Sequence, residues 1–460
     1  MTRRQEKKSK SPFFLTEVYS IGIYYAIKHF RFLFTVLIGF QSCVLMAANP
    51  IASCLDLQSM QYDLAGEYEL VTDIDCTGIN FSPIGSTAVP FMGKLDGKGH
   101  KISNLFIDKR NDNSVGLFSA TYKQAKIQNL ILENIEILGA GRVGGLIGVA
   151  LNTTISNIKI QGKITGTGEY VGGIVASTQL TTINNSNVDG IVKGLSFVGG
   201  LAGSLWGTVN NSYTNTRVTG RIVVGGLIGR VTGEINNSYA TGDVDGNSYP
   251  DYYTSNSIGG LVGDTISGAI NNSYATGKVD GEAKVGGLAG QASIQIANSY
   301  ATGNVNGKSY VGGLIGTYYA SKASINNSYA NGVVIGETYI GGLVGKTSGV
   351  ITNSYATGNV RGKSSVGGLI GFSQTTINNC YAVGKVEAEK IFGGLIGDGS
   401  FPTTINSYWD IQTSEQSISV GGEGKSTSEM FQSNNYQGWD FIKIWNIKEG
   451  EVYPTLYKIP

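Results

Sequence analysis

The sequence has little charge, little proline and almost no histidine. Asp, Glu, Lys and Arg make up 15% of the 460 residues, with 8 Pro and 2 His. At 41% hydrophobic and 10% aromatic residues, the chain is too apolar for an intrinsically disordered protein. The 67 Gly count against long helices, because an interior Gly costs a helix about 1 kcal/mol relative to Ala.

The scarcity of His excludes the common catalytic and zinc-binding arrangements. His29 lies in a basic leader, and His100 lies in a Gly-rich turn, DGKGH, with no Ser or Cys partner in a recognisable context. There is no His pair and no Cys-x-x-Cys motif. We therefore expect a capping-turn role for His100, no catalytic or metal site, no cofactor, and a protein that is not an enzyme.

The charge is unevenly distributed. The segment from Met1 to Arg31 is strongly basic, although the whole chain has a net charge of only +1. The remainder is mildly acidic, so nothing attracts it to nucleic acid, and we expect no nucleic-acid partner.

An uncharged run at residues 32–46 follows the basic stretch and leads into Ala47 and Ala48. This pattern predicts a secretory signal or leader over residues 1–48 and a secreted or cell-surface protein without a membrane span in the mature chain. Two alternatives stay open: a retained anchor that begins near Ile21, and lipidation of Cys54, which ends a segment resembling a bacterial lipobox.

Of the four Cys, Cys43 leaves with the leader and Cys380 stands alone. Cys54 and Cys76 both lie in the first exported segment, and export to an oxidising compartment favours a disulfide between them. In the chain-entropy model such a loop contributes about 3 kcal/mol. The alternative is two buried free thiols.

An internal repeat dominates the rest of the chain. Gly-Gly followed by an aliphatic residue recurs at a nearly constant spacing, as from Gly286 to Gly312, with one long gap caused by an insertion at residues 247–256. In phase with it runs Ser-Tyr-Ala-Thr-Gly-x-Val or a close variant. The Gly pairs begin at Gly144, Gly172, Gly199, Gly225, Gly259, Gly286, Gly312, Gly341, Gly367 and Gly393, and the Tyr are Tyr213, Tyr239, Tyr274, Tyr300, Tyr329, Tyr355, Tyr381 and Tyr408.

One repeat has room for short strands but not for a helix of ordinary length, and it buries too little apolar surface to fold alone. Stacked coils solve this problem, because each strand then pairs with its copies above and below. We expect an all-β parallel β-helix, or β-solenoid, right-handed by the crossover rule, with about ten coils. Its predicted parts are N-terminal capping coils over 49–140, repeats over 141–407 and a C-terminal cap over 408–460, whose Trp409, Trp439 and Trp445 are expected to cover the last coil.

The VGGLIG and NNSYATG units resemble the GLUG-motif repeat family of bacterial secreted and surface proteins, which includes haemagglutinin-like adhesins. Residues 68–105 resemble the leader coil that precedes such repeats, and the Trp-containing tail after Tyr408 resembles the family's closing segment. The resemblance implies an architecture and an extracellular setting, whereas family members have different activities.

Two columns of the repeat allow side-chain directions to be predicted. Cys380 replaces the repeat Ser, and Cys is usually buried, so we expect the Ser column to face inward and the neighbouring Tyr column outward. The Asn beside each Ser-Tyr, such as Asn236, Asn271, Asn326 and Asn378, are expected to form a hydrogen-bonded ladder. The eight Tyr are a candidate binding stripe for a host or matrix glycan or protein; the alternative is that the rings stabilise one another.

Acidic residues are the remaining candidates. Asp73 and Asp75 lie two apart and have the spacing to hold Ca²⁺, although exposed strand carboxylates are favoured. Asp243, Asp245, Asp264, Asp280 and Lys278 are expected in solvated turns. We therefore hypothesise an adhesive or structural rod; the alternative is a carbohydrate-binding or polysaccharide-degrading β-helix.

Overall fold

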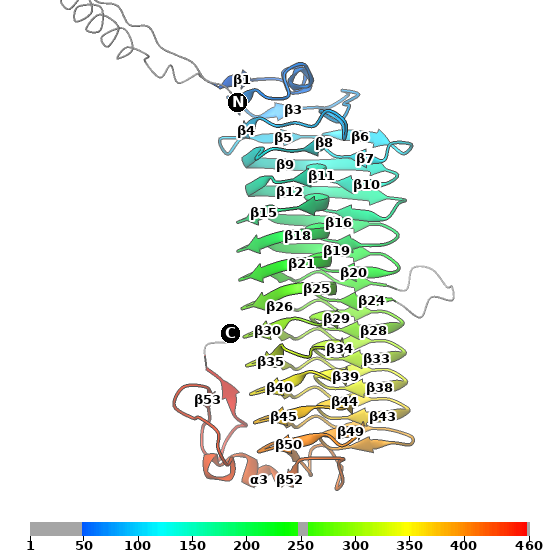
Figure 1. Cartoon of the computed structure of the whole chain (residues 1–460), viewed down its shortest axis with the longest axis vertical. Helices are drawn as coiled ribbons and strands as arrows, with labels where there is room; N and C mark the ends of the chain where they lie inside the picture. Colours follow the sequence, from blue (N-terminus) through cyan, green and yellow to red (C-terminus); the bar gives the residue numbers. More distant parts are fainter. Residues whose placement is uncertain (1–47, 247–255, 458–460) are drawn as a thin grey trace, which may run out of the picture. The chain divides into compact units, whose positions relative to one another are not determined.

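The structure is a computed structural model that describes residues 48–246 and 256–457. The leader predicted over residues 1–48, apart from Ala48, and the insertion at 247–256, apart from Asn256, lie outside these residues. From Asn49 onward the described chain winds into coils stacked along one axis (Figure 1).

The Gly-Gly repeat forms a narrow corner of each coil. A Cβ on Gly312 would collide with the carbonyl of Ile315 in the following strand, and a Cβ on Gly313 would collide with the equivalent Gly carbonyl one coil later. A Cβ on Gly316 would collide with the backbone of Lys284, one coil earlier. The three glycines thus let neighbouring strands and coils pack backbone against backbone.

The strands that run into this corner form an eleven-stranded parallel sheet. They are β7 (Ser114–Val115), β10 (Arg142–Gly144), β13 (Tyr170–Gly172), β17 (Val198–Gly199), β20 (Val223–Gly225), β24 (Ser257–Gly259), β28 (Ala283–Gly286), β33 (Ser309–Gly312), β38 (Thr338–Gly341), β43 (Ser364–Gly367) and β48 (Phe392–Gly393).

The other strands of the coils form a 41-stranded sheet in which each strand pairs in parallel with its copies in the adjacent coils. The strands after the Gly corner are β8 (Phe118–Thr121), β11 (Ile147–Leu151), β14 (Val175–Gln179), β18 (Ala202–Asn210), β21 (Ile228–Asn236), β25 (Val262–Asn271), β29 (Ala289–Ala292), β34 (Ile315–Tyr318), β39 (Val344–Thr347), β44 (Ile370–Ser373) and β49 (Ile396–Gly399). The strands that lead to the Asn column are β4 (Lys94–Asp96), β15 (Thr181–Asn184), β30 (Gln295–Ala297), β35 (Ser324–Asn326), β40 (Val350–Thr352), β45 (Thr376–Asn378) and β50 (Thr403–Ile405).

The strands of the Tyr and Val positions complete each coil. Those at the Tyr position are β16 (Asn187–Lys193), β19 (Tyr213–Thr219), β22 (Tyr239–Ala240), β26 (Tyr274–Ala275), β31 (Tyr300–Ala301), β36 (Tyr329–Ala330), β41 (Tyr355–Ala356), β46 (Tyr381–Ala382) and β51 (Tyr408–Asp410). Those at the Val position are β23 (Val244–Asp245), β27 (Val279–Asp280), β32 (Val305–Asn306), β37 (Val334–Ile335), β42 (Val360–Arg361) and β47 (Val386–Glu387).

The coils begin earlier in the chain than the Gly-Gly repeat does. Val115 of β7 pairs with Val143 of β10, although only one Gly follows it. The first elements are β1 (Asn49–Ile51), α2 (Cys54–Ser59), a 3-10 turn η1 (Met60–Tyr62), β2 (Glu67–Leu70), β3 (Ile74–Asp75), β5 (Lys101–Ser103), β6 (Phe106–Lys109), β9 (Lys126–Gly139) and β12 (Thr154–Gly166). The predicted all-β parallel solenoid is confirmed, with about 12 turns where about ten were predicted.

The Ser column lies inside, as Cys380 indicated. Ser273 and its copies are buried, and from Ser212 to Ser354 each hydroxyl accepts a hydrogen bond from the amide of the Ser one coil earlier, at 3.1 Å for Ser238 and Ser273. The Asn ladder is present at Asn236 and Asn271, whose side chains join at 3.0 Å, but it stops where Ala297 takes the next position. The buried hydroxyls of the Ser column are therefore paired along the stack.

After β51 the chain leaves the repeat. Its elements are β52 (Glu423–Lys425), the one-turn helix α3 (Thr427–Met430), a 3-10 turn η2 (Ser433–Asn435), β53 (Trp445–Asn446) and β54 (Thr455–Leu456). We call residues 426–457 the tail. Strands β53 and β54 pair with each other antiparallel and lie beside the coils of β40 and β45 (Figure 1).

Candidate functional site

The candidate Tyr stripe is a continuous stack of rings. Register pairing places Tyr239 directly on Tyr274, and the same pairing repeats from Tyr213 to Tyr408. From Tyr213 to Tyr381 the neighbouring ring centroids lie 4.7–5.0 Å apart, with planes within 9° of parallel. The faces of the inner rings are covered by their neighbours, so the stack presents ring edges rather than ring faces.

The stripe was expected to be exposed, but the tail covers much of it. Tyr213 is 37% exposed, whereas Tyr300, Tyr329, Tyr355, Tyr381 and Tyr408 are all buried. Trp445 packs on Tyr355 and Tyr381 at centroid distances of 6.0 Å. The Tyr381 hydroxyl donates to the Pro454 carbonyl at 2.5 Å.

Burial changes the acidity of the covered rings. It raises the pKa of Tyr329 to about 12 and the pKa of Tyr381 well above its usual value. In Tyr453 of the tail, burial and then a hydrogen bond to Asp410 raise the pKa to about 12. The phenols are neutral at physiological pH, and the stripe is open to a ligand mainly at Tyr213, Tyr239 and Tyr274.

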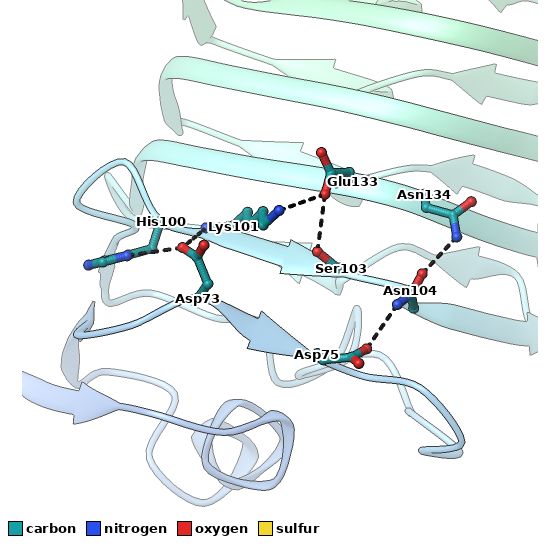
Figure 2. Close-up of polar contacts among 8 residues, drawn as sticks. All are labelled: Asp73, Asp75, His100, Lys101, Ser103, Asn104, Glu133 and Asn134. Atoms are coloured by element: carbon teal, nitrogen blue, oxygen red, sulfur yellow. Dashed lines mark hydrogen bonds and ion pairs between the residues drawn. The ribbon is translucent and has the colours of Figure 1, made fainter.

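The candidate Ca²⁺ carboxylates are bonded to side chains and amides of the next leader coil (Figure 2). Asp73 accepts from the Lys101 amide at 3.1 Å and lies 3.1 Å from His100 Nδ1. The Lys101 amide contributes most to the lowered pKa of Asp73. His100 lies in the turn between β4 and β5, and this contact joins that turn to the preceding leader coil.

Asp75 belongs to a separate contact chain. Its carboxylate accepts from Asn104 at 2.9 Å, and Asn134 donates to Asn104 at 2.7 Å (Figure 2). Together with bonds from Thr77, the Asn104 bond lowers the pKa of Asp75. In the described part of the chain no three His, Cys, Asp or Glu side chains are grouped to hold a metal ion. The geometry is that of hydrogen-bonded turns.

The structure joins Cys54 to Cys76 by a disulfide, with 5.3 Å between the Cα atoms. Both residues are buried, and the bond ties α2 to the end of β3. Cys380 is a buried free thiol in the Ser column, and burial raises its pKa to about 12.

Asp264 was expected in a solvated turn, and this expectation is wrong. Its side chain is 8% exposed and forms a 3.0 Å ion pair with Arg230, one coil earlier. Burial raises the pKa of Asp264, with Arg230 opposing the shift. The Arg230 guanidinium also lies over the Phe197 ring at 4.5 Å. Residues directly after the GGLxG segment thus project onto side chains of the preceding coil, which the repeat pattern alone did not reveal.

Sequence analysis missed a second aromatic group. Tyr310, Tyr339 and Phe372 come from three successive coils and surround Lys346. A signal was available, because both Tyr stand two residues before a Gly-Gly pair.

The family model described as the GLUG motif matches four segments of the chain, at residues 220–245, 281–306, 336–361 and 362–387. Halomucin from Haloquadratum walsbyi is 35% identical over 139 residues, which are 26% of this chain and 2% of halomucin. A protein of Evansella cellulosilytica named "Putative Gly-rich membrane protein" is 34% identical over 102 residues, 20% of this chain and 12% of that protein. The matches therefore span a small part of both relatives.

Among solved structures, one titled "IgA1 Protease" has 21% sequence identity and a TM-score of 0.42, with coverage of 62% of this chain and 22% of that chain. In the described residues no helix is long and apolar enough to cross a membrane. Each of the four matched motifs spans one coil of the solenoid, so this part of the chain is built of GLUG-motif repeats.

Proposed function

We propose that the protein is a non-enzymatic, secreted or cell-surface β-solenoid that serves as a structural or adhesive rod. The observation that carries this proposal is that the repeated residues contact their own copies in adjacent coils. The Gly, Ser and Tyr columns all contact their own copies in adjacent coils. Contacts of this kind stabilise a stiff stack, and the number of coils sets its length.

Export is supported by the basic and apolar leader and by the disulfide near the start of the coils. The partner proposed for the rod is a glycan or a protein of a host or matrix. Polysaccharide degradation is the second candidate function. It would need Asp, Lys or Arg aligned in consecutive coils, and in the clearest such pair the buried Asp264 is already held by an ion pair with Arg230.

Coil deletion tests the rod. Residues 220–245 and residues 281–306 are each one matched repeat, and removal of either leaves an equivalent stacking interface. In cells that display the full chain, both deletions should shorten the rod by one strand spacing, about 4.8 Å, and should reduce attachment to glycan-coated and protein-coated surfaces equally. N-terminal sequencing of the surface fraction should find the leader removed.

Two results would contradict this proposal. If attachment depends on one of the two repeats and not on the other, a local site rather than the rod carries the function. Release of reducing sugar from a polysaccharide by the purified chain, abolished by Asp264→Asn, would establish an enzyme.

A further inference from the structure

In the repeat coils, the residue directly before the buried Ser or Cys has a left-handed backbone conformation. Asn occupies this position from Asn185 to Asn406 in nine coils. Asn is the expected choice, because its short polar side chain tolerates this conformation better than other residues with a Cβ. At this corner, the residue found is the one that backbone strain predicts.

A second left-handed position precedes the Gly corner, and there the residues are different. In five coils it holds Phe197, Lys284, Tyr310, Tyr339 and Ser365. A bulky side chain strains the backbone in this conformation, at a cost in stability. Aromatic rings that are retained at such a cost, on the outer surface of the coil, point to a use other than folding.

The rings of Tyr310 and Tyr339 form a short stack, with centroids 5.1 Å apart. Phe372 meets Tyr339 edge-to-face at 5.7 Å. The Lys346 ammonium lies 5.8, 5.9 and 5.2 Å from the centroids of Tyr310, Tyr339 and Phe372. All four side chains are half-buried. We call these four residues the aromatic–lysine cluster.

The ammonium of Lys346 differs from its neighbours because it has no carboxylate partner among the described residues. Lys308 pairs with Glu282 at 2.7 Å, and Lys363 pairs with Glu337 at 3.4 Å. In the comparable group around Phe197, Arg230 is neutralised by Asp264. The aromatic–lysine cluster therefore keeps a net positive charge that three rings shield from water on one side.

The two ends of the short stack carry no further parallel ring. In register, Lys284 precedes Tyr310 and Ser365 follows Tyr339, and Phe372 meets Tyr339 only edge-to-face. The long Tyr stripe, by contrast, has its inner ring faces covered. The cluster thus combines aromatic surface for the CH face of a sugar with a cation for a carboxylate.

We propose that the aromatic–lysine cluster binds an acidic polysaccharide built of uronic acids, with a sugar ring on Tyr310 or Tyr339 and its carboxylate on Lys346. A cationic ligand is excluded by charge, because the rings already hold an ammonium. The inference deepens the proposed adhesive function by naming the class of glycan. It rests on that function only for the place where the protein encounters the glycan, outside the cell.

Titration of the purified full chain with alginate, a polymer of uronic acids, tests the proposal, with neutral dextran as the comparison. Lys346→Gln should weaken alginate binding by about tenfold, the loss of one charge-assisted contact. Lys363→Gln, which removes a paired surface ammonium nearby, is the matched control and should leave affinity within about twofold.

A second variant separates binding from folding. Tyr339→Asn places Asn, the residue found at the other left-handed corner, at the corner before the Gly-Gly pair. Thermal stability should therefore stay equal or rise, while alginate binding should weaken as it does in Lys346→Gln. The proposal is overturned if the full chain does not bind alginate, if dextran binds equally well, or if Lys363→Gln weakens binding as much as Lys346→Gln. None of these results depends on coil-deletion attachment, which tests the rod.

Discussion

At the scale of single residues, the Ser column shows how a polar side chain is accommodated in a dry core. The Ser273 hydroxyl donates to the Asn271 carbonyl at 2.7 Å and accepts from the Ser238 amide at 3.1 Å. Asn271 belongs to the same coil as Ser273, whereas Ser238 belongs to the coil before it, where strand pairing leaves the Ser238 amide without a backbone acceptor. The hydroxyl therefore replaces one missing rung of the backbone ladder.

Ser273→Ala should destabilise the protein by about 1–3 kcal/mol, because it leaves the buried Ser238 amide without a partner, whereas the Asn271 carbonyl still accepts from the Asn237 amide. Cys380→Ser is the matched variant in the same column. It restores the repeat residue and should change the free energy of unfolding by less than about 1 kcal/mol. Urea denaturation followed by circular dichroism measures both. Similar stabilities for the two variants would contradict a structural role for the ladder.

For single residues, the sequence predicted the direction of interior side chains well and the contacts of outer side chains poorly. Cys380 correctly indicated the direction of the Ser column, because a buried position accepts only small or apolar substitutes. Asp264 was misplaced, because its burial depends on Arg230, which lies 34 positions earlier. Contacts between unlike side chains of adjacent coils carry no periodic signal.

At the scale of elements, the C-terminal segment does two different things. Trp409 of β51 takes the register position of Ala382 and joins the solenoid core at its last coil. Trp439 and Trp445 were expected to cover this same end, but they pack on the flank, against Tyr381 and Tyr355. The tail is irregular, so its path along the flank was not predictable from periodicity.

The tail should detach at alkaline pH. An unfolded Tyr has a pKa near 10, whereas Tyr329 and Tyr453 have pKa values of about 12 in the folded protein. The folded state thus retains protons that the unfolded state loses, so their stabilisation is complete below about pH 10 and is lost as the pH rises toward about 12. A red shift of Trp fluorescence over this interval, before the β signal in circular dichroism is lost, is the expected result.

Two Tyr→Phe variants provide the control for that experiment. Tyr329→Phe removes one buried ionisable group and should make the transition shallower. Tyr213→Phe changes the exposed end of the stripe, away from the tail, and should leave the transition unchanged. An alkaline transition identical in both variants would show that the buried phenols do not control tail docking.

At the scale of the whole molecule, the short and regular period of the repeat was enough to predict the solenoid, since a repeat that cannot fold alone must stack. It did not give the full number of turns, because β7 lies in the Gly-corner sheet with one Gly where later coils have two. The leader coils depart from the repeat in sequence but continue its strand pairing, as Leu95 with Ile127 shows.

The end of the stack is the place where whole-molecule behaviour can be tested. An uncovered final coil presents unpaired strand edges and an apolar core layer, both of which promote association. In the structure β51 and β52 close this end, because β52 pairs on β51 and the Trp409 indole fills the space beside Gly394. The tail beyond Lys425 covers only the Tyr flank. Closure of the stack end and coverage of the Tyr flank therefore belong to two different segments, which can be removed separately.

Truncation after Ser407 removes both covers, whereas truncation after Lys425 removes the tail but keeps β51 and β52. The shorter protein should oligomerise or aggregate at concentrations where the full chain is monomeric, as measured by light scattering. The longer one should stay monomeric and bind more of an apolar dye, because the Tyr355 and Tyr381 rings become accessible. If both truncated proteins remain monomeric, the last coil does not need a cover, and the pairing of β52 on β51 would have to serve binding rather than protection of the edge.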